Sequence, residues 1–409
     1  MTRFTGRARQ PKELSWSRIF NKPKHYRKMK MALDFLKRDN NLKDHNLFGD
    51  EHFGTEPPCT QYEKKPLLNP DGNEVEGLYT AWITLNNPAQ YGSYTTEMVK
   101  GVIAGMHKAS MSRDVVATIF TGTGDRAFCA GGNVKEYAEY YTKRPKEYAD
   151  YVDLFAGMVD AILKCRTPVI CRANGMRIGG GQEIGQACDL TVSADTANFG
   201  QAGTRHGSVP DGGSTDFLPW NLSMEQAMWN CISNEQWGAY KMERLGLIIK
   251  AIPIKKDSAG NWVPNPLVIT DTYSRNGQIV YGEPKTGEEL AEAKELFKTL
   301  TTDFSWFDQH INNMVWTLAN LMPLCLMKSI ETIRTKKRFF WDANKVSGMY
   351  GLAANMNAEA WLGFNAFNIQ KITGTSVIDF IELRRQYAKG HIYDDELAEM
   401  VFYPPKNQK

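Results

Sequence analysis

The chain has 409 residues, of which 42% are apolar and 11% aromatic, so it is long enough for one large domain with additions or for two domains. Its formal net charge is only +3, which gives no support to nucleic-acid binding. Seven scattered cysteines without CxxC spacing argue against both a disulfide framework and a zinc site.

The distribution of apolar residues gives no sign of export or membrane insertion. The start of the chain lacks the apolar segment of a secretion signal. The uncharged stretch Ile311–Met327 holds three asparagines and a proline and is too short to span a bilayer comfortably. We therefore expect a cytoplasmic protein without a membrane partner, a nucleic-acid partner or a metal.

Residues 1–75 are polar and irregular, and we expect them to form an N-terminal extension. Residues 1–30 carry ten Lys or Arg against one acid, Glu13. This pattern favours a solvated or subunit-bridging arm, with contact to phosphates or to an acidic neighbour as the alternative. Near the end of the segment, Asn69-Pro-Asp-Gly-Asn73 predicts the turn of a β-hairpin.

Residues 76–254 alternate between strand-like and helix-like patterns. This alternation predicts an α/β core. We expect a single helix over Glu225–Leu245 and a closing strand within Gly246–Pro253. The other predicted strands are 78–85, 115–120, 168–172 and 190–193, and the other predicted helices are 95–110 and 135–165, with a break near Pro145.

The chain changes character after Pro253. Residues 255–286 are rich in Gly, Asn and Pro with short β-like runs, and we interpret them as an insertion. Residues 287–409 are predicted to be a helical C-terminal region, with Pro323 interrupting one segment. The apolar content of Met314–Leu326 and Phe364–Phe367 leads us to expect that this region contacts neighbouring subunits.

The stretch Thr167–Asp189 combines a buried strand, three glycines and a helix with an acid on its first turn. Gly179, Gly180 and Gly181 would allow a ligand to approach backbone N–H groups that the helix start leaves unpaired. Glu183 follows on the first turn, where a carboxylate beside such donors suits acid–base chemistry on a developing oxyanion. The alternative is a glycine-rich turn with Glu183 as a solvated first-turn acid.

A second glycine-bearing turn, Gly122–Asn133, follows a predicted strand. Its fragment Gly122-x-Gly-x-x-Ala127 is a weak match to a dinucleotide fingerprint, because Asp125 and Arg126 put charge where such a loop prefers small residues. The other interpretation is that the turn around Gly132 supplies a second backbone N–H donor. Two N–H groups from separate turns suit a thioester oxygen that becomes an enolate.

A third stretch, Asn198–Asp216, is loop-like and glycine-rich and carries His206 and Asp211. Either residue could serve catalysis, although an ordinary loop histidine and an ordinary Asp-Gly turn are the alternatives. The chain contains no GxSxG and no HExxH sequence, so a serine hydrolase triad or a zincin has no motif support.

Together these stretches resemble the crotonase (enoyl-CoA hydratase/isomerase) superfamily over about residues 78–254. The order and spacing of the motifs make the resemblance specific. The matching motifs are Arg126-Ala-Phe-Cys-Ala-Gly-Gly132, Asn174-Gly-x-x-x-Gly-Gly-Gly-x-Glu183, Ala187-Cys-Asp-Leu190, Asn198-Phe-Gly200 and Leu245-Gly-Leu-Ile-x-x-x-Ile-Pro253.

The resemblance implies an α/β spiral of ββα turns with a helical C-terminal trimerisation region, assembled as homotrimers or hexamers. It also implies an acyl-CoA thioester substrate and no cofactor other than the CoA that the substrate carries. The oxyanion-hole N–H groups fall on Gly132 and Gly180. Contacts to CoA are expected from Arg126, Phe128 and Ala130.

Within the superfamily the chain is most similar to the ring-opening hydrolases that act on 6-oxocyclohex-1-ene-1-carbonyl-CoA in anaerobic benzoyl-CoA degradation. This resemblance extends over most of the chain, and it implies that two waters are consumed to give 3-hydroxypimeloyl-CoA. Its marks are Lys135-Glu-Tyr-Ala-Glu-Tyr-Tyr141, Phe199-Gly-Gln-Ala-Gly203, Thr215-Asp-Phe-Leu-Pro219, the long insertion after Pro253, and Asn357–Phe367.

The catalytic residues carry over only in part. Typical hydratases have a second glutamate at the position of Gly203, so the two-glutamate mechanism of water addition does not transfer. We expect Glu183 to be the main acid/base, with Asp211 and His206 as candidates for orienting or deprotonating water. The alternatives are an enoyl-CoA or cyclic dienoyl-CoA hydratase that leaves the ring closed, and a non-catalytic CoA-binding or scaffolding protein.

Overall fold

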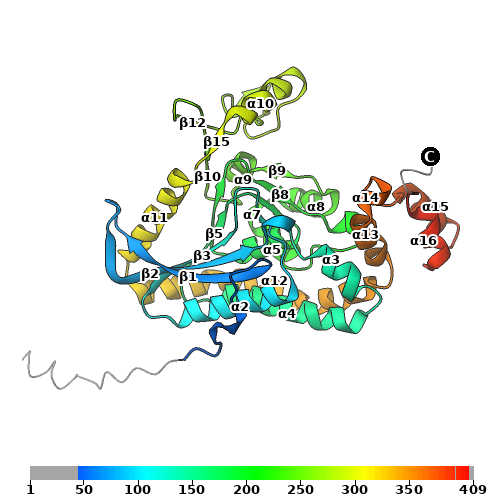
Figure 1. Cartoon of the computed structure of the whole chain (residues 1–409), viewed down its shortest axis with the longest axis horizontal. Helices are drawn as coiled ribbons and strands as arrows, with labels where there is room; N and C mark the ends of the chain where they lie inside the picture. Colours follow the sequence, from blue (N-terminus) through cyan, green and yellow to red (C-terminus); the bar gives the residue numbers. More distant parts are fainter. Residues whose placement is uncertain (1–44, 392, 405–409) are drawn as a thin grey trace, which may run out of the picture. The chain divides into compact units, whose positions relative to one another are not determined.

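The computed structural model describes residues 45–391 and 393–404 (Figure 1). From Asn46 onward, the described residues form one compact unit. The basic segment 1–30, for which the sequence predicts an arm, lies outside the described residues.

Two β-sheets organise the described part of the chain. The larger sheet has six strands in the order β1-β2-β3-β5-β7-β10, parallel from β2 onward and antiparallel between β1 and β2. Its strands are β1 (Cys59–Leu68), β2 (Glu74–Asn86), β3 (Val115–Gly122), β5 (Val169–Ala173), β7 (Leu190–Ala194) and β10 (Lys250–Ile252). The smaller sheet has the order β4 (Ala127–Cys129), β6 (Met176–Ile178), β8 (Asn198–Gly200), β9 (Trp237–Gly238).

Each successive turn of the chain contributes one strand to the larger sheet, one strand to the smaller sheet and then a helix. β3 and β4 are followed by α4 (Pro145–Lys164), and β5 and β6 are followed by α5 (Gly180–Ala187). β7 and β8 repeat the pattern. This ββα spiral is the fold class that the sequence predicted, and the structure confirms it.

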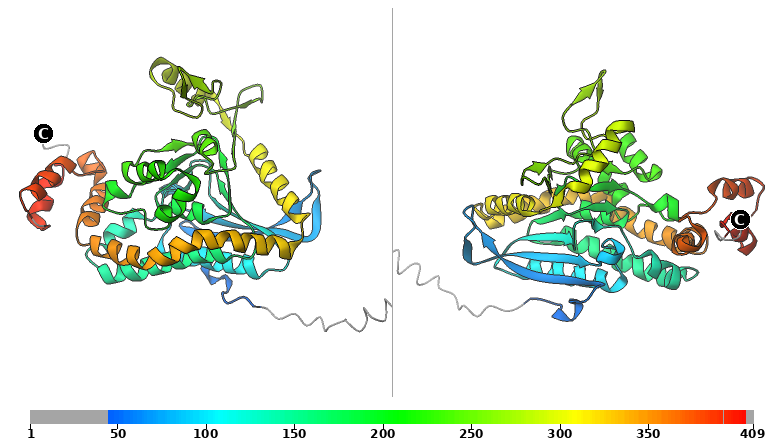
Figure 2. Two further views of the ribbon diagram at one scale, coloured as in Figure 1. Left: turned by 180° about the vertical axis from the view of Figure 1, so that it is seen from behind. Right: turned by 45° about the horizontal axis from the view of Figure 1, so that its top comes forward.

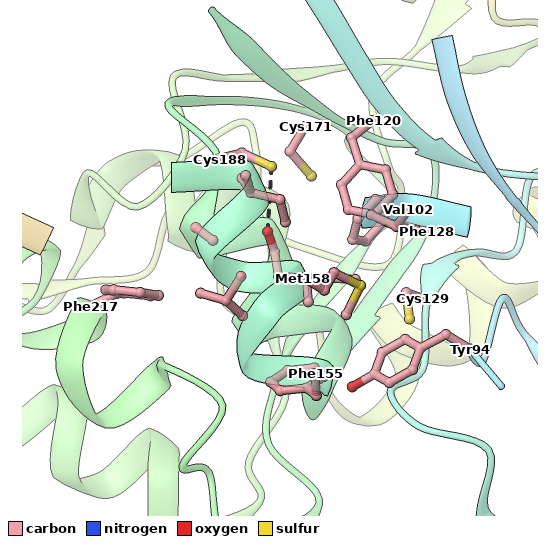
Figure 3. Packing of buried hydrophobic residues seen from close by; sticks show 14 of the residues in the cluster. Tyr94, Val102, Phe120, Phe128, Cys129, Phe155, Met158, Cys171, Cys188 and Phe217 are labelled. Atoms are coloured by element: carbon pink, nitrogen blue, oxygen red, sulfur yellow. Dashed lines mark hydrogen bonds between the residues drawn. The ribbon is translucent and has the colours of Figure 1, made fainter. Parts of the chain in front are cut away.

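The main core lies between the larger sheet and the helices that cover it. α2 (Thr96–Met111) begins where the Thr95 side chain accepts a hydrogen bond from the Met98 N–H. Its buried residue Val102 lies near Phe120 of β3, Phe128 of β4 and Met158 of α4 (Figure 3). Apolar residues spaced three and four apart on both helices therefore pack onto one face of the sheet.

Short helical elements precede, join or follow the strands. They are η2 (Asp50–His52), η3 (Pro88–Gln90), α3 (Val134–Glu136), η4 (Tyr137–Tyr141), α6 (Gly203–His206), α7 (Ser214–Asn221), α8 (Met224–Ser233) and α9 (Ala239–Leu245).

The hairpin predicted at Asn69–Asn73 is confirmed, since β1 and β2 pair across this turn. The larger sheet consequently begins at Cys59, inside the range 1–75 that the sequence assigned to an extension. Cys59 and Asn86 are partners in the register, so β1 is an integral edge strand of the sheet. The charged run Glu63-Lys64-Lys65 in β1 suits such an edge, and this polarity made the segment resemble an extension.

The single helix predicted over Glu225–Leu245 is wrong. α8 ends at Ser233 because Asn234 adopts a left-handed conformation with φ of 58°. The chain then pairs with β8 as the short strand β9 before α9 begins at Ala239.

The segment after Pro253 forms a small separate sheet in the order β12-β11-β15 and a β-hairpin. α10 (Gly287–Thr299) lies between these strands in sequence, because β15 returns to pair with β11. The structural excursion therefore extends past residue 286, where the predicted insertion ended. Its strands are β11 (Lys255–Lys256), β12 (Trp262–Val263), β13 (Ser274–Arg275), β14 (Gln278–Ile279) and β15 (Thr301–Thr302).

The remaining C-terminal residues are mainly helical, as the sequence predicted. The 33-residue helix α12 begins at Pro323 and runs alongside α4, as the views in Figures 1 and 2 agree. Among the described residues, no helix has the length and apolar content needed to cross a bilayer. These helices are α11 (Ser305–Ala319), α12 (Pro323–Asn355), α13 (Glu359–Asn368), α14 (Gln370–Thr373), α15 (Phe380–Ala388) and α16 (Asp395–Val401).

Candidate active site

A cavity of about 120 Å³ lies where the glycine turns after β4 and β6 meet α4, α12 and the loop before α7. Its wall is mixed, with backbone from glycines on one side and aromatic side chains on another. The residues that line it include Tyr94, Gly132, Tyr137, Tyr148, Tyr151, Gly180, Glu183, His206, Asp211, Trp341 and Phe364.

The first glycine turn enters α5, and its residues Gly179 and Gly180 line the cavity. Gly179 is the N-cap of the helix and has a φ of 57°, a backbone conformation that residues other than glycine rarely adopt. The sequence suggested that Gly180 belongs to a loop ahead of the helix. In the structure it is the first helical residue. Its N–H has no hydrogen-bond acceptor among the described residues, as expected for the first turn of a helix.

The second glycine turn, Ala130–Gly132, lies directly against the first. Gly131 has φ of 102°, and a Cβ atom built on it would lie 3.0 Å from the Gly180 nitrogen. The Asn174 side chain links the turn between β5 and β6 to the ends of β3 and β4, because its Oδ1 accepts from the Gly122 N–H at 3.1 Å and its Nδ2 donates to the Ala127 carbonyl at 3.0 Å. Gly132 and Gly180, the two predicted oxyanion donors, therefore line the same cavity.

Glu183 faces this cavity from the first turn of α5. Its side chain is only 6% exposed, and its Oε1 accepts a hydrogen bond from the Gly212 N–H at 2.9 Å. Burial, and next the negative charge of Asp211, raise the pKa of Glu183 from 4.5 to about 8. The carboxyl group is therefore mostly protonated at neutral pH, so it can donate a proton and, once ionised, take one back.

Asp211 lies on the loop between α6 and α7, and it lines the cavity together with Glu183. A Cβ atom built on Gly348 of α12 would lie 2.9 Å from the Asp211 Cβ, so the helix backbone packs directly on this aspartate. Burial, and next the charge of Asp216, raise the pKa of Asp211 above its usual value. The Asp211 charge in turn contributes to the raised pKa of Glu183.

His206 reaches the cavity from the end of α6. Its ring lies edge-on to Phe367 with centroids 5.5 Å apart, and its buried Nδ1 has no hydrogen-bond partner among the described residues. Burial, and next the charge of Arg205, lower the pKa of His206 to about 4. The imidazole is therefore neutral at neutral pH and a weaker base than an unperturbed histidine.

Comparison with known proteins agrees with this geometry. The enoyl-CoA hydratase/isomerase family model matches residues 79–263. A 6-oxocyclohex-1-ene-1-carbonyl-CoA hydrolase of Syntrophus aciditrophicus (strain SB) is 58% identical over 379 residues, which cover 92% of this chain and 99% of that protein. The chain belongs to the enoyl-CoA hydratase/isomerase family.

Two further relatives with the same name also match most of this chain. The protein of Thauera aromatica is 50% identical across 88% of this chain and 94% of its own length. The protein of Geobacter metallireducens is 47% identical across 90% and 96%. The resemblance found in the sequence, to the family and to these hydrolases, is confirmed.

Solved structures support the crotonase fold. The crystal structure of an enoyl-CoA hydratase from Bacillus halodurans aligns with a TM-score of 0.54 and covers 75% of this chain and 99% of that chain. Because the identity is 14%, this likeness concerns the fold alone.

The residues expected to bind CoA do not all face the cavity of this family member. Ala130 lines it. Phe128 is 0% exposed and packs edge-on against Phe120 at 5.2 Å, so its side chain is core and is not available to CoA. Arg126 lies outside the cavity lining, where its Nη2 donates to the Tyr91 hydroxyl at 2.6 Å and its guanidinium covers the Tyr91 ring. It stays a candidate for the more distant parts of CoA.

Sequence reasoning missed the aromatic wall of the cavity. Tyr137 comes from η4, while Tyr148, Tyr151 and Phe155 follow one another at helical spacing on α4. Burial raises the pKa of Tyr148, with the charges of Glu183 and Asp211 adding to the effect. The i, i+3, i+7 spacing was a usable signal for a shared face, but it does not distinguish a core face from a cavity face.

Proposed function

We propose that the protein is a ring-opening hydrolase that converts 6-oxocyclohex-1-ene-1-carbonyl-CoA and two waters to 3-hydroxypimeloyl-CoA, in anaerobic benzoyl-CoA degradation. The observation that carries the proposal is the 58% identity to a hydrolase of that name across 99% of its length. Gly203, in place of the second glutamate of typical hydratases, supports a departure from simple water addition.

The size and lining of the cavity support a cyclic acyl group. A volume of about 120 Å³ is close to that of about 150 Å³ cavities that hold benzene in other proteins. The aromatic side chains along α4 provide flat apolar surfaces for a six-membered ring. CoA enters with the substrate, and the proposed reaction requires neither a metal nor a redox cofactor.

In the first step, water adds to the ring double bond. Asp211, as carboxylate, accepts a proton from the water as its oxygen bonds to ring C2. The electron pair moves to the thioester oxygen, where the N–H groups of Gly132 and Gly180 stabilise the enolate. Glu183 then donates its proton to ring C1. Its raised pKa keeps this proton in place at neutral pH.

In the second step, the ionised Glu183 accepts a proton from a second water as its oxygen bonds to the ring ketone carbon, C6. The C1–C6 bond breaks, and its electron pair forms the thioester enolate at the same oxyanion hole. Asp211 returns its proton to C1, and C6, still bonded to C5, becomes the terminal carboxyl group of the opened chain. Both residues recover their starting protonation states, so one pair serves both steps.

Product masses test this proposal. Incubation with the cyclic oxo-enoyl-CoA is expected to give a product heavier by two waters, with a free carboxyl group. A product heavier by one water identifies a hydratase that leaves the ring closed. A thioester that binds but keeps its mass identifies a non-catalytic CoA-binding protein. Either result contradicts the proposal.

We further propose that the protein works as a homotrimer or as a hexamer of paired trimers, in the cytoplasm. All seven cysteines are free thiols, which suits a reducing compartment. Large apolar side chains are exposed along α12, which suits burial against another subunit. They include Leu324, Ile333, Phe339, Phe340 and Val346. Phe364, from which we also expected a subunit contact, packs inside its own subunit instead.

Sedimentation tests the assembly. The wild-type protein is expected to sediment as three or six chains, because α12 would otherwise leave Phe339 71% exposed. Phe339→Asp is expected to shift the distribution toward monomer, since it places a charge in the proposed interface. Lys328→Asp, which changes the charge at an exposed polar position of the same helix, serves as the comparison. A wild-type protein that sediments as a monomer contradicts the proposal.

A further inference from the structure

Tyr94 places an unpaired hydroxyl group in the cavity. Its side chain is 2% exposed and stacks on Phe155 with centroids 5.8 Å apart. Figure 3 shows the hydroxyl oxygen on the side of the ring that faces Phe155. The hydroxyl makes no hydrogen bond to any described residue, whereas Tyr137 pairs with Tyr151 at 2.5 Å and Tyr141 pairs with Thr96 at 2.6 Å.

Both oxyanion donors contact Tyr94. Its N–H donates to the Gly131 carbonyl and its carbonyl accepts from the Asn133 N–H, each at 3.0 Å, so its backbone brackets Gly132. Its hydroxyl lies over Gly180, where a Cβ atom would overlap it. Burial, and next the charges of Tyr137, Cys129 and Glu183, raise the pKa of Tyr94 well above its usual value. The group is therefore a neutral donor beside the oxyanion hole.

The proposed reaction requires a donor at this place. The substrate carries a thioester on ring C1 and a ketone on the adjacent C6, so its two oxygens can face the same side and lie next to each other. Attack of the second water puts negative charge first on the ketone oxygen and only after bond cleavage on the thioester oxygen. In the proposed mechanism the N–H groups of Gly132 and Gly180 donate to the thioester oxygen, so the ketone oxygen needs another partner.

We propose that the Tyr94 hydroxyl donates a hydrogen bond to the ring ketone oxygen, which orients the ring and stabilises that oxygen as water attacks C6. This inference rests on the proposed ring-opening function. The water oxygen bonds to C6, its proton goes to Glu183, and the carbonyl π pair moves onto the ketone oxygen. When the C1–C6 bond breaks, this carbonyl re-forms as part of the new carboxyl group, and Tyr94 keeps its proton throughout.

Two half-substrates, assayed with the Tyr94→Phe variant, separate the role of the ketone oxygen from that of the thioester oxygen. The ketone-free cyclohex-1-ene-1-carbonyl-CoA reports hydration alone, and 2-oxocyclohexane-1-carbonyl-CoA reports ring opening alone. Tyr94→Phe is expected to slow ring opening by about 10²-fold, as loss of one oxyanion donor does. Hydration is expected to change less than about 3-fold, because the thioester oxygen keeps its two N–H donors.

Tyr141→Phe is the matched control, because its hydroxyl bonds Thr96 and lies outside the cavity lining. It is expected to keep wild-type rates with both half-substrates. Equal losses of hydration and ring opening in Tyr94→Phe would assign the hydroxyl to the thioester oxygen and overturn the proposal. Wild-type rates in Tyr94→Phe, or the same selective loss in Tyr141→Phe, would overturn it as well.

A binding measurement separates this inference from the proposed function. In the Glu183→Gln background, affinities are compared for 2-oxocyclohexane-1-carbonyl-CoA and cyclohexane-1-carbonyl-CoA. Adding Tyr94→Phe is expected to remove a preference of about 3- to 10-fold for the ketone. If the wild-type protein opens no ring but this preference disappears, the function is wrong and the Tyr94 contact holds. If the preference persists, the Tyr94 contact is wrong.

Discussion

Glu183→Gln is expected to lower ring-opening turnover by about 10²–10⁴-fold while thioester binding stays close to wild type. Glutamine keeps the shape of the side chain and the oxygen that accepts from the Gly212 N–H at 2.9 Å. It can neither donate the proton to ring C1 nor accept one from the second water. Turnover of the cyclic oxo-enoyl-CoA and affinity for its ketone-free analogue, measured on the same preparations, check the two halves of this expectation.

The same substitution is expected to stabilise the fold increasingly as pH rises. The pKa of Glu183 is about 8 in the folded protein, against 4.5 in an ordinary glutamate. Above about pH 4.5 the unfolded chain loses this proton while the folded chain keeps it, so stability falls until the folded group also ionises near pH 8. Glutamine removes this loss, which is on the order of a few kcal/mol. Denaturant unfolding at pH 5 and pH 8 measures it.

Glu97→Gln provides the matched control, because Glu97 lies on the surface of α2 in an exposed ion pair with Lys100. It is expected to leave turnover unchanged and to show no comparable rise in stability with pH. A Glu183→Gln variant with near-normal turnover would place the acid–base chemistry on another residue. If the stability difference between Glu183→Gln and the wild type does not grow between pH 5 and pH 8, the raised pKa of Glu183 is contradicted.

The parts of the site that the sequence predicted are those carried by short local motifs. Gly180 and Glu183 lie three positions apart on one helix start, so the motif itself fixes their proximity. Gly132 was placed by a motif that the family shares and Asp211 by its position on the glycine-rich loop after Asn198–Gly200, and the structure brings both to the same cavity. The α/β class was predictable because strand and helix patterns alternate along residues 76–254, whereas the ββα spiral was predicted from the resemblance to the family.

Parts of the site that depend on long-range packing were not predictable. Trp341 and Lys345 reach the cavity from α12, and their place in it depends on how that helix packs against α4. Phe128 shows the converse. Its motif position suggested contact with CoA, but β4 is buried on both faces and its side chains serve the core. Tyr94 lies just before α2, outside the periodic pattern that predicts this helix. Only the structure shows that its hydroxyl packs over Gly180.

Asp211→Asn is expected to slow the water steps by about 10²–10⁴-fold and to affect binding of the CoA moiety little. The amide that replaces the carboxylate in this variant does not accept a proton from the first water. Because the Asp211 charge raises the pKa of Glu183, its removal is also expected to shift the ionisation of Glu183 to lower pH. Hydration and ring opening, each followed across pH, measure both effects.

His206→Gln is the comparison that decides which cavity residue acts on water. A pKa of about 4 makes His206 a weak base, so its replacement is expected to cost less than about 10-fold and to leave the Glu183 ionisation in place. A larger loss in His206→Gln than in Asp211→Asn would reverse this assignment. If both variants open the ring at the wild-type rate, neither residue is the water base, and Glu183 carries both steps alone.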